Sequence, residues 1–231
     1  MTVKTANDVT EDTQPCSVGW DRLAALLGRI CAFFVWLLAL SWRSDADALA
    51  KIDEQLAAGK PVIAVFWHSS YLALFALAAG RPVTVFTSRS FRGKVIAGIC
   101  RRFGYDPYLL PPGRQGYHDM RHVLLEKTRD ANRPVLVGIA IDGPLGPRHA
   151  VKLGALHMAA RMAAALMPIR VTSRPVWAIT SRWDHFKIPL PFAKVRLDVG
   201  PAMAVPNGFG RNPAQIEALR KQVHDRLNGQ G

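Results

Sequence analysis

The chain has 231 residues, 49% of them hydrophobic, which is enough for one domain with a well-buried core. The apolar content excludes an intrinsically disordered chain, and three widely spaced cysteines argue against a disulfide framework or a zinc site. The chain carries 30 Lys and Arg against 17 Asp and Glu, a net charge of +13 that favours an anionic partner, either nucleic acid or an acidic membrane surface.

The first 44 residues divide into a tail and an apolar helix. Residues 1–15 are polar and acidic, and we predict a disordered tail there. Residues 16–44 are predicted to form a membrane-associating helix, because the apolar stretch 23–42 would extend about 30 Å as a helix. One stripe of this helix holds residues that recur every seven positions: Arg22, Arg29, Trp36 and Arg43. An arginine at the bilayer centre costs about 2.5–3.5 kcal/mol, so we favour a helix in the membrane interface over a span, with a core-packed helix as the third possibility.

Residues 45–231 are predicted to form a single α/β domain. A polar helix is expected at residues 45–58, before Gly59 and Pro61, which end helices. Short apolar or β-branched runs then predict strands at residues 61–68, 82–88, 106–110, 134–142, 168–173 and 195–200. Helical spacing predicts helices at residues 70–79, 93–103, 117–129 and 153–167, with a final polar helix at 213–227. This alternation indicates a mostly parallel sheet flanked by helices on both faces.

Two of the predicted strands end in residues that can carry chemistry. His68 follows the strand in VIAVFWHSS, and Asp142 follows another strand. Reactive groups in open α/β sheets gather where strands end and helices begin. We therefore expect both side chains at the functional edge of the sheet.

The segment DGPLGPR (142–148) connects a predicted strand to a predicted helix. Its two Gly-Pro pairs predict a rigid loop with close backbone approach, without the spacing of a P-loop. The backbone of Gly143 and the side chains of Arg148 and Lys152 would present N–H groups and cations at a helix N-terminus. Such an arrangement suits a phosphate group.

Several segments, taken in order, resemble the bacterial DUF374 family of the lysophospholipid acyltransferase-like superfamily. They are FWH (66–68), DGPLGPR (142–148), MPI (167–169) and SRWDHFKIPLPF (181–192). The resemblance covers about residues 60–206. It implies a glycerol-3-phosphate acyltransferase-like fold, in which a mostly parallel sheet is flanked by helices.

The resemblance also implies an activity. A fatty acyl group would pass from acyl-CoA or acyl-carrier protein, as a cosubstrate, to a lysophospholipid or lipid A-like acceptor at the cytoplasmic face of the bacterial inner membrane. No cofactor, metal ion or nucleic acid is implied. His68 would act as the general base, since a neutral imidazole can take the proton of an attacking hydroxyl. Arg148 and Lys152 would hold the acceptor's phosphate, with Arg114 and Arg92 as more distant candidates.

The chain departs from the family pattern at several positions. The wider superfamily carries an aspartate five residues after the histidine, where this chain has Ala73. We therefore expect Asp142, at a neighbouring strand end, to align the other ring nitrogen of His68. Two further family segments are replaced by Arg92–Lys94 and by Pro112–Gly116.

The late segment SRWDHFKIPLPF receives a structural interpretation. An aromatic residue beside Pro189 and Pro191 is typical of a loop anchor, so Trp183 and Asp184 are predicted to have a structural role in this segment.

Two other functions remain open at the sequence level. A catalytically inactive relative that keeps a lipid cleft would explain Ala73 and the replaced segments. A nucleic-acid-binding protein would explain the charge of +13, but no basic helix-turn-helix, zinc finger or aromatic-studded sheet motif accompanies it.

Overall fold

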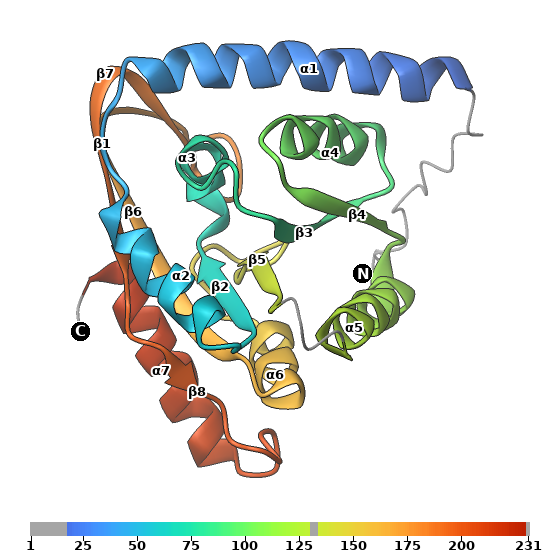
Figure 1. Ribbon diagram of the computed structural model, residues 1–231, viewed down its shortest axis with the longest axis vertical. Helices are drawn as coiled ribbons and strands as arrows, with labels where there is room; N and C mark the ends of the chain where they lie inside the picture. Colours follow the sequence, from blue (N-terminus) through green and yellow to red (C-terminus); the bar gives the residue numbers. More distant parts are fainter. Residues whose placement is uncertain (1–17, 130–133, 230–231) are drawn as a thin grey trace, which may run out of the picture.

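The computed structural model describes residues 18–129 and 134–229, and the predicted disordered tail at residues 1–15 lies outside these ranges. Within them, eight strands form one sheet in the order β1-β7-β6-β2-β5-β3-β4, with β8 paired to β6 (Figure 1). The strands are β1 (Arg43–Asp45), β2 (Val62–Phe66), β3 (Val83–Ser88), β4 (Asp106–Leu110), β5 (Leu136–Ala140), β6 (Ala165–Ile179), β7 (Phe186–Val199) and β8 (Met203–Ala204). The helices are α1 (Val18–Leu40), α2 (Ala50–Ala57), α3 (Tyr71–Leu77), α4 (Phe91–Arg102), α5 (Gly113–Arg129), α6 (Leu153–Met162) and α7 (Pro213–Asn228).

The sheet is mostly parallel and is covered on both faces, as the sequence predicted. Strands β2 to β5 and the start of β6 run parallel, whereas β6 pairs antiparallel with β7 and β8. Alternate residues of β2 point to opposite faces. Ile63 and Val65 pack with residues of α5, α6 and α7, and Val62 and Ala64 pack with residues of α1, α2, α3 and α4. The result is a three-layered α/β fold.

The β6–β7 hairpin is the main antiparallel part of the sheet. Its strands are long, and the turn between them, residues 180–185, lies at the same edge of the sheet as the end of β2. The register shifts within the hairpin: Arg174 pairs with Lys194, but Val176 pairs with Pro189. Four residues of β7, 190–193, therefore face the single residue Pro175 and form a bulge.

Helix α1 lies along the domain with its small residues inward. Figure 1 shows it running across the top of the molecule over α3 and α4, which it contacts. Ala24, Gly28 and Ala32 are buried, and a Cβ on Gly28 would lie 2.8 Å from Cα of Gly98 in α4. The large apolar side chains of α1 are exposed: Trp20, Leu23, Leu26, Ile30, Phe33, Phe34, Trp36, Leu37 and Leu40. A soluble amphipathic helix has the reverse arrangement, with its large apolar side chains buried.

Several predicted boundaries differ from the structure. The strands predicted at 168–173 and 195–200 are longer, as β6 and β7. The N-terminal helix ends at Leu40, because Trp42 enters the core and residues 43–45 pair with β7 as β1. The helix predicted at 153–167 ends at Met162, since Ala163 has a left-handed φ of 48°. Residues 165–167 belong instead to β6, and a short, wholly apolar run cannot be assigned to helix or strand by periodicity.

Candidate active site

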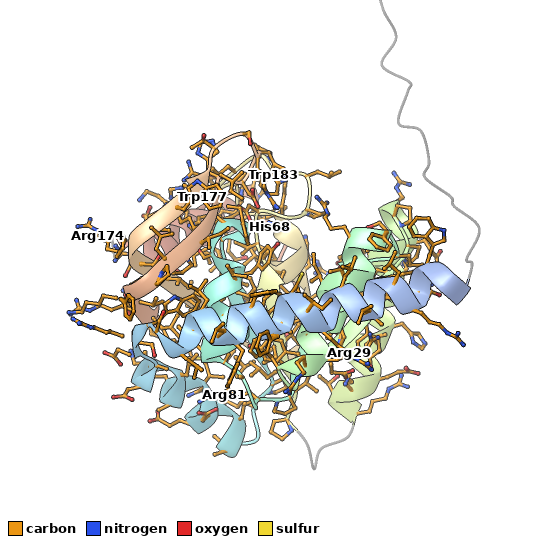
Figure 2. All side chains as sticks on the ribbon, turned by 90° about the horizontal axis from the view of Figure 1, so that it is seen from above. Arg29, His68, Arg81, Arg174, Trp177 and Trp183 are labelled. Atoms are coloured by element: carbon orange, nitrogen blue, oxygen red, sulfur yellow. The ribbon has the colours of Figure 1, made fainter. Side chains whose placement is uncertain are left out.

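The ring of His68 is held by a carboxylate from a distant part of the chain. His68 opens a single 3-10 turn, η2 (His68–Ser70), which connects β2 to α3. Its Nδ1 lies 2.8 Å from Oδ2 of Asp184, which is fully buried in the turn between β6 and β7. Since an ionised carboxylate only accepts hydrogen bonds, Nδ1 is the donor in this contact, which leaves Nε2 of a neutral ring with its lone pair. Figure 2 shows His68 and Trp183 on the same side of α1, seen from above.

Arg182 fixes the Asp184 carboxylate. Its Nε and Nη2 donate to the two carboxylate oxygens at 3.0 and 2.8 Å, a bidentate contact. Burial raises the pKa of Asp184, but the hydrogen bonds from Arg182 and His68 outweigh burial, so this pKa lies below its usual range. Asp184 is therefore ionised at neutral pH. It can orient the His68 ring and stabilise the imidazolium that forms when Nε2 takes a proton.

Asp142, the carboxylate that the sequence predicted for the His68 ring, accepts backbone N–H groups instead. Its Oδ1 accepts from the N–H of His68 at 2.9 Å, and its Oδ2 accepts from the N–H of His149 at 3.4 Å. Burial raises the pKa of Asp142, and these N–H groups offset only part of the rise. The predicted contact with the imidazole is therefore wrong. Asp142 ties the turn after β2 to the loop after β5.

The DGPLGPR loop packs against His68 through Trp183. The ring centroids of Trp183 and His68 are 5.2 Å apart. A Cβ on Gly146 would lie 2.7 Å from Cε3 of Trp183, and Gly146 has a φ of 69°. Both the close approach of Trp183 and the left-handed backbone therefore favour glycine at this position. Trp183 thus has a structural role, as the sequence led us to expect, but the loop that it contacts is DGPLGPR. Asp184, predicted to share that structural role, contacts the candidate base instead.

Two cations, Arg148 of this loop and Lys187 of β7, lie near His149. Burial, Arg148 and Lys187 lower the pKa of His149 to about 4, and burial and Arg148 lower the pKa of Lys187. The three side chains therefore lie within electrostatic reach of one another. His149 also stacks on Trp67, with ring centroids 4.7 Å apart. A phosphate bound here would relieve the repulsion between Arg148 and Lys187.

The other predicted phosphate ligands are brought to the site unequally. Lys152 is exposed at the N-cap of α6, the helix that the loop enters. Arg92 lies within electrostatic reach of Tyr71, whose ring is 5.1 Å from that of His68. Among the described residues, no hydrogen bond or ion pair joins Arg114, in the first turn of α5, to His68. Within those same residues, no group of three or more His, Cys, Asp or Glu is placed to hold a metal ion.

Three residues of this site were missed by sequence reasoning: Arg182, Asp184 and Lys187. All lie in SRWDHFKIPLPF, the segment that carries much of the DUF374 resemblance, and that signal could have marked them as candidates. The pairing itself had no sequence signal, because His68 and Asp184 are 116 residues apart.

An apolar cavity of about 60 Å³ lies under the site, on the side of the sheet that carries α2 and α3. Tyr71 lines this cavity and also contacts the ring of His68. A Cβ on Gly138 of β5 would lie 3.2 Å from Cγ1 of Val83 and 3.6 Å from Cε1 of Phe66, two other lining residues. Glycine at position 138 therefore leaves space where another residue would narrow the cavity.

Comparisons with known proteins find distant similarities. No protein-family model matches the chain, so the resemblance to DUF374 stays a prediction. An uncharacterized protein of Rickettsia prowazekii is 24% identical over 207 residues, which cover 87% of this chain and 93% of that protein. The crystal structure of the 1-acyl-sn-glycerophosphate acyltransferase from Thermotoga maritima matches with a TM-score of 0.46 and 16% identity, over 90% of this chain and 94% of that one. At these levels neither similarity assigns an activity.

Proposed function

We propose that this protein is a membrane-associated acyltransferase. It would transfer a fatty acyl group from acyl-CoA or acyl-carrier protein to a lysophospholipid or lipid A-like acceptor. The observation that carries this proposal is the contact of 2.8 Å between His68 and the buried Asp184, beside the DGPLGPR loop. The segments that resemble DUF374 supply both residues of this pair and the loop.

His68 would act as the general base through Nε2. As the acceptor hydroxyl attacks the thioester carbonyl carbon, Nε2 takes the hydroxyl proton, and Asp184 stabilises the resulting imidazolium. The tetrahedral intermediate then collapses and the carbon–sulfur bond breaks. The thiolate leaves with the proton from His68, so the products are an ester and a free thiol. The side chain of His68 is 22% exposed, which leaves the ring accessible to substrate.

Arg148 and Lys187 would hold the acceptor's phosphate. The Asp142 carboxylate joins the backbone of His68 to that of His149, which directly follows Arg148. A phosphate at Arg148 and Lys187 would therefore be fixed relative to the base through one rigid loop. Bidentate arginine contacts with phosphate supply both affinity and orientation.

The cavity beside Tyr71 would receive the first part of the acyl chain. Its volume of about 60 Å³ corresponds to roughly two water molecules. A long chain would therefore need side chains such as Leu74 and Phe75 to move, or would continue along the outside of the molecule. We propose that Gly138 sets the width of the cavity at this point.

Helix α1 would attach the protein to the membrane while lying flat on its surface. The helix is long and apolar enough to cross a membrane, but one side is packed on α4 through Gly28 and Gly98. A helix packed along its length on a folded domain cannot also stand across a bilayer. The exposed large apolar side chains of α1 would instead enter the acyl region from the side. This favours the interfacial helix over the span and over the fully core-packed helix.

Acyl transfer from a labelled thioester to total bacterial lipid tests the proposal. Both acyl-CoA and acyl-carrier protein should be supplied as donors, and the acylated product identified by mass spectrometry. The His68→Ala variant is the control, because background transfer would persist in it. An inactive lipid-binding relative predicts no transfer with either donor. One sequence argument for inactivity was Ala73. The contact between Asp184 and His68 weakens this argument, because Asp184 would supply the missing carboxylate.

A further inference from the structure

The bulge in β7 exposes apolar side chains beside the end of α1. Leu190 and Phe192 are 37% and 73% exposed, and Trp177 on the neighbouring strand β6 is 58% exposed. The N–H of Phe192 donates to Oγ of Ser41 at 3.1 Å, so the bulge adjoins the residue after α1. The exposed apolar surface of α1 therefore continues onto the hairpin.

Phe192 is also held in an unfavourable backbone conformation. Its φ is 61°, in the left-handed region that bulky side chains rarely adopt. Burial of the Phe192 side chain does not offset this strain, because most of the side chain is exposed. Strained residues that do not serve the core are typical of functional surfaces.

A row of three cations lies directly beside this apolar surface. In the registers of the sheet, Arg43 of β1 pairs with Lys194 of β7, and Lys194 pairs with Arg174 of β6. All three side chains are exposed, and adjacent strands are about 4.8 Å apart. Within residues 18–129 and 134–229, none of the three forms an ion pair. Like charges directly opposite each other destabilise a sheet, so an anionic partner would stabilise the row.

The cationic row lies next to the apolar bulge, just as the head groups of a membrane lie next to its acyl region. Lys194 is two residues from Phe192 in β7, and Arg43 is three residues from Leu40, the exposed last residue of α1. Figure 2 shows Arg174 pointing away from the body of the protein at the outer side of the hairpin that carries Trp177. Apolar side chains would thus enter the acyl region while the three cations reach the head groups.

We propose that the β6–β7 hairpin is a second membrane-contacting element, whose Arg43–Lys194–Arg174 row binds the phosphates of anionic lipid head groups. The inference rests on the membrane attachment proposed for α1, but not on acyl transfer. An acidic protein partner would account for the charges but not for the exposed apolar side chains. A membrane also accounts for the adjoining exposed apolar side chains, including the strained Phe192.

Vesicle flotation of the full-length chain tests this inference. One set of vesicles contains phosphatidylcholine alone, and the other contains phosphatidylglycerol as well. The row variant is Arg43→Gln, Lys194→Gln and Arg174→Gln, and the matched control is Lys60→Gln, Arg161→Gln and Arg211→Gln, three exposed cations on other elements. Thermal melting of each variant checks that it is folded.

The row variant should bind phosphatidylglycerol vesicles about a hundredfold more weakly, at about fivefold for each charge removed. Its binding to phosphatidylcholine vesicles should stay unchanged, because α1 is intact. The control variant should bind both kinds of vesicle like the wild type. The inference is overturned if the row variant keeps its preference for phosphatidylglycerol, or if the control variant loses that preference to the same extent.

A second variant tests the apolar part of the surface. Phe192→Asn keeps a residue that tolerates the left-handed backbone, and we combine it with Trp177→Ser. This variant should bind both kinds of vesicle more weakly by a similar factor, since it removes apolar contacts and no charge. Unchanged binding to both kinds would exclude the hairpin from the membrane surface.

Discussion

His68 and Asp184 are 116 residues apart in the chain, yet Nδ1 of one lies 2.8 Å from Oδ2 of the other. The carboxylate is fully buried and is also bound by Arg182. Under the proposed function, Asp184 would be a positioning residue, which acts on the acceptor through the histidine.

His68→Ala should reduce turnover by about 10²–10⁴-fold, and Asp184→Asn should reduce turnover by a factor in the same range. The double variant should be little slower than His68→Ala, because residues that act as one unit are not additive. Rates of acyl transfer from a labelled thioester, with thermal melting as the folding control, measure this. If the loss of turnover in the double variant equals the product of the two single losses, the two residues act independently and Asp184 has a purely structural role.

Arg148→Ala should raise KM for a phosphate-bearing acceptor about ten- to hundredfold, since a hydrogen bond to a charged group contributes about 1.5–3 kcal/mol. KM for the thioester donor should change much less. Arg161→Ala is the matched control, because Arg161 is exposed on α6 but belongs to no part of the proposed site. If acceptor KM rises equally in both variants, a general loss of positive charge explains the effect, and Arg148 is not a specific ligand.

Gly138→Ala should shift the donor preference toward shorter acyl chains. The added Cβ would lie 3.2 Å from Val83 and would narrow the cavity beside Tyr71. Turnover with the shortest donors should be unchanged, and turnover should fall as the chain lengthens. A series of acyl thioesters measured at fixed acceptor concentration gives the result. A uniform loss across the series would point to a folding defect and against a cavity that receives the chain.

His149→Asn should make the protein less sensitive to mild acid. Burial, Arg148 and Lys187 lower the pKa of His149 to about 4 in the folded state, against 6.5 for an unperturbed histidine. Between these values the unfolded chain binds the proton more readily, so the wild type loses stability as the pH falls from 6.5 towards 4. Asparagine tolerates the left-handed φ of 58° at this position. Melting temperatures at about pH 7 and about pH 4.5 should show a smaller difference in the variant than in the wild type.

Phe34→Ser together with Leu37→Ser should release the protein from membranes, because both side chains lie on the exposed side of α1. Arg22→Ser together with Arg29→Ser, on the same helix, should leave it membrane-bound at high salt. Membrane and soluble fractions separated by centrifugation measure the outcome. Deleting residues 1–43 is a poorer test, since it would uncover the surface of α4 around Val95 and Gly98 and favour aggregation. If the variant with Phe34→Ser and Leu37→Ser stays on membranes at high salt, the attachment surface lies elsewhere.

The sequence by itself determined the class of fold and one half of the site. Apolar strands alternating with helices of ordinary length predicted a parallel sheet covered on both faces. The end of β2 placed His68 at the reactive edge. Glycine and proline in DGPLGPR predicted the rigid loop. These features depend on local periodicity and on backbone preferences of single residues, which are readable without knowledge of distant contacts.

Only the tertiary structure decided which carboxylate meets His68 and which side of α1 is buried. Asp142 and Asp184 both suit a histidine by type, and the choice follows from the antiparallel return of β7, which brings residue 184 to the end of β2. The inward stripe of α1 holds the small residues Ala24, Gly28 and Ala32 where α4 approaches it. A pattern of apolar residues does not reveal which of them a neighbouring helix will cover. Long-range strand pairing and helix packing fix these contacts, and neither leaves a periodic signal in the chain.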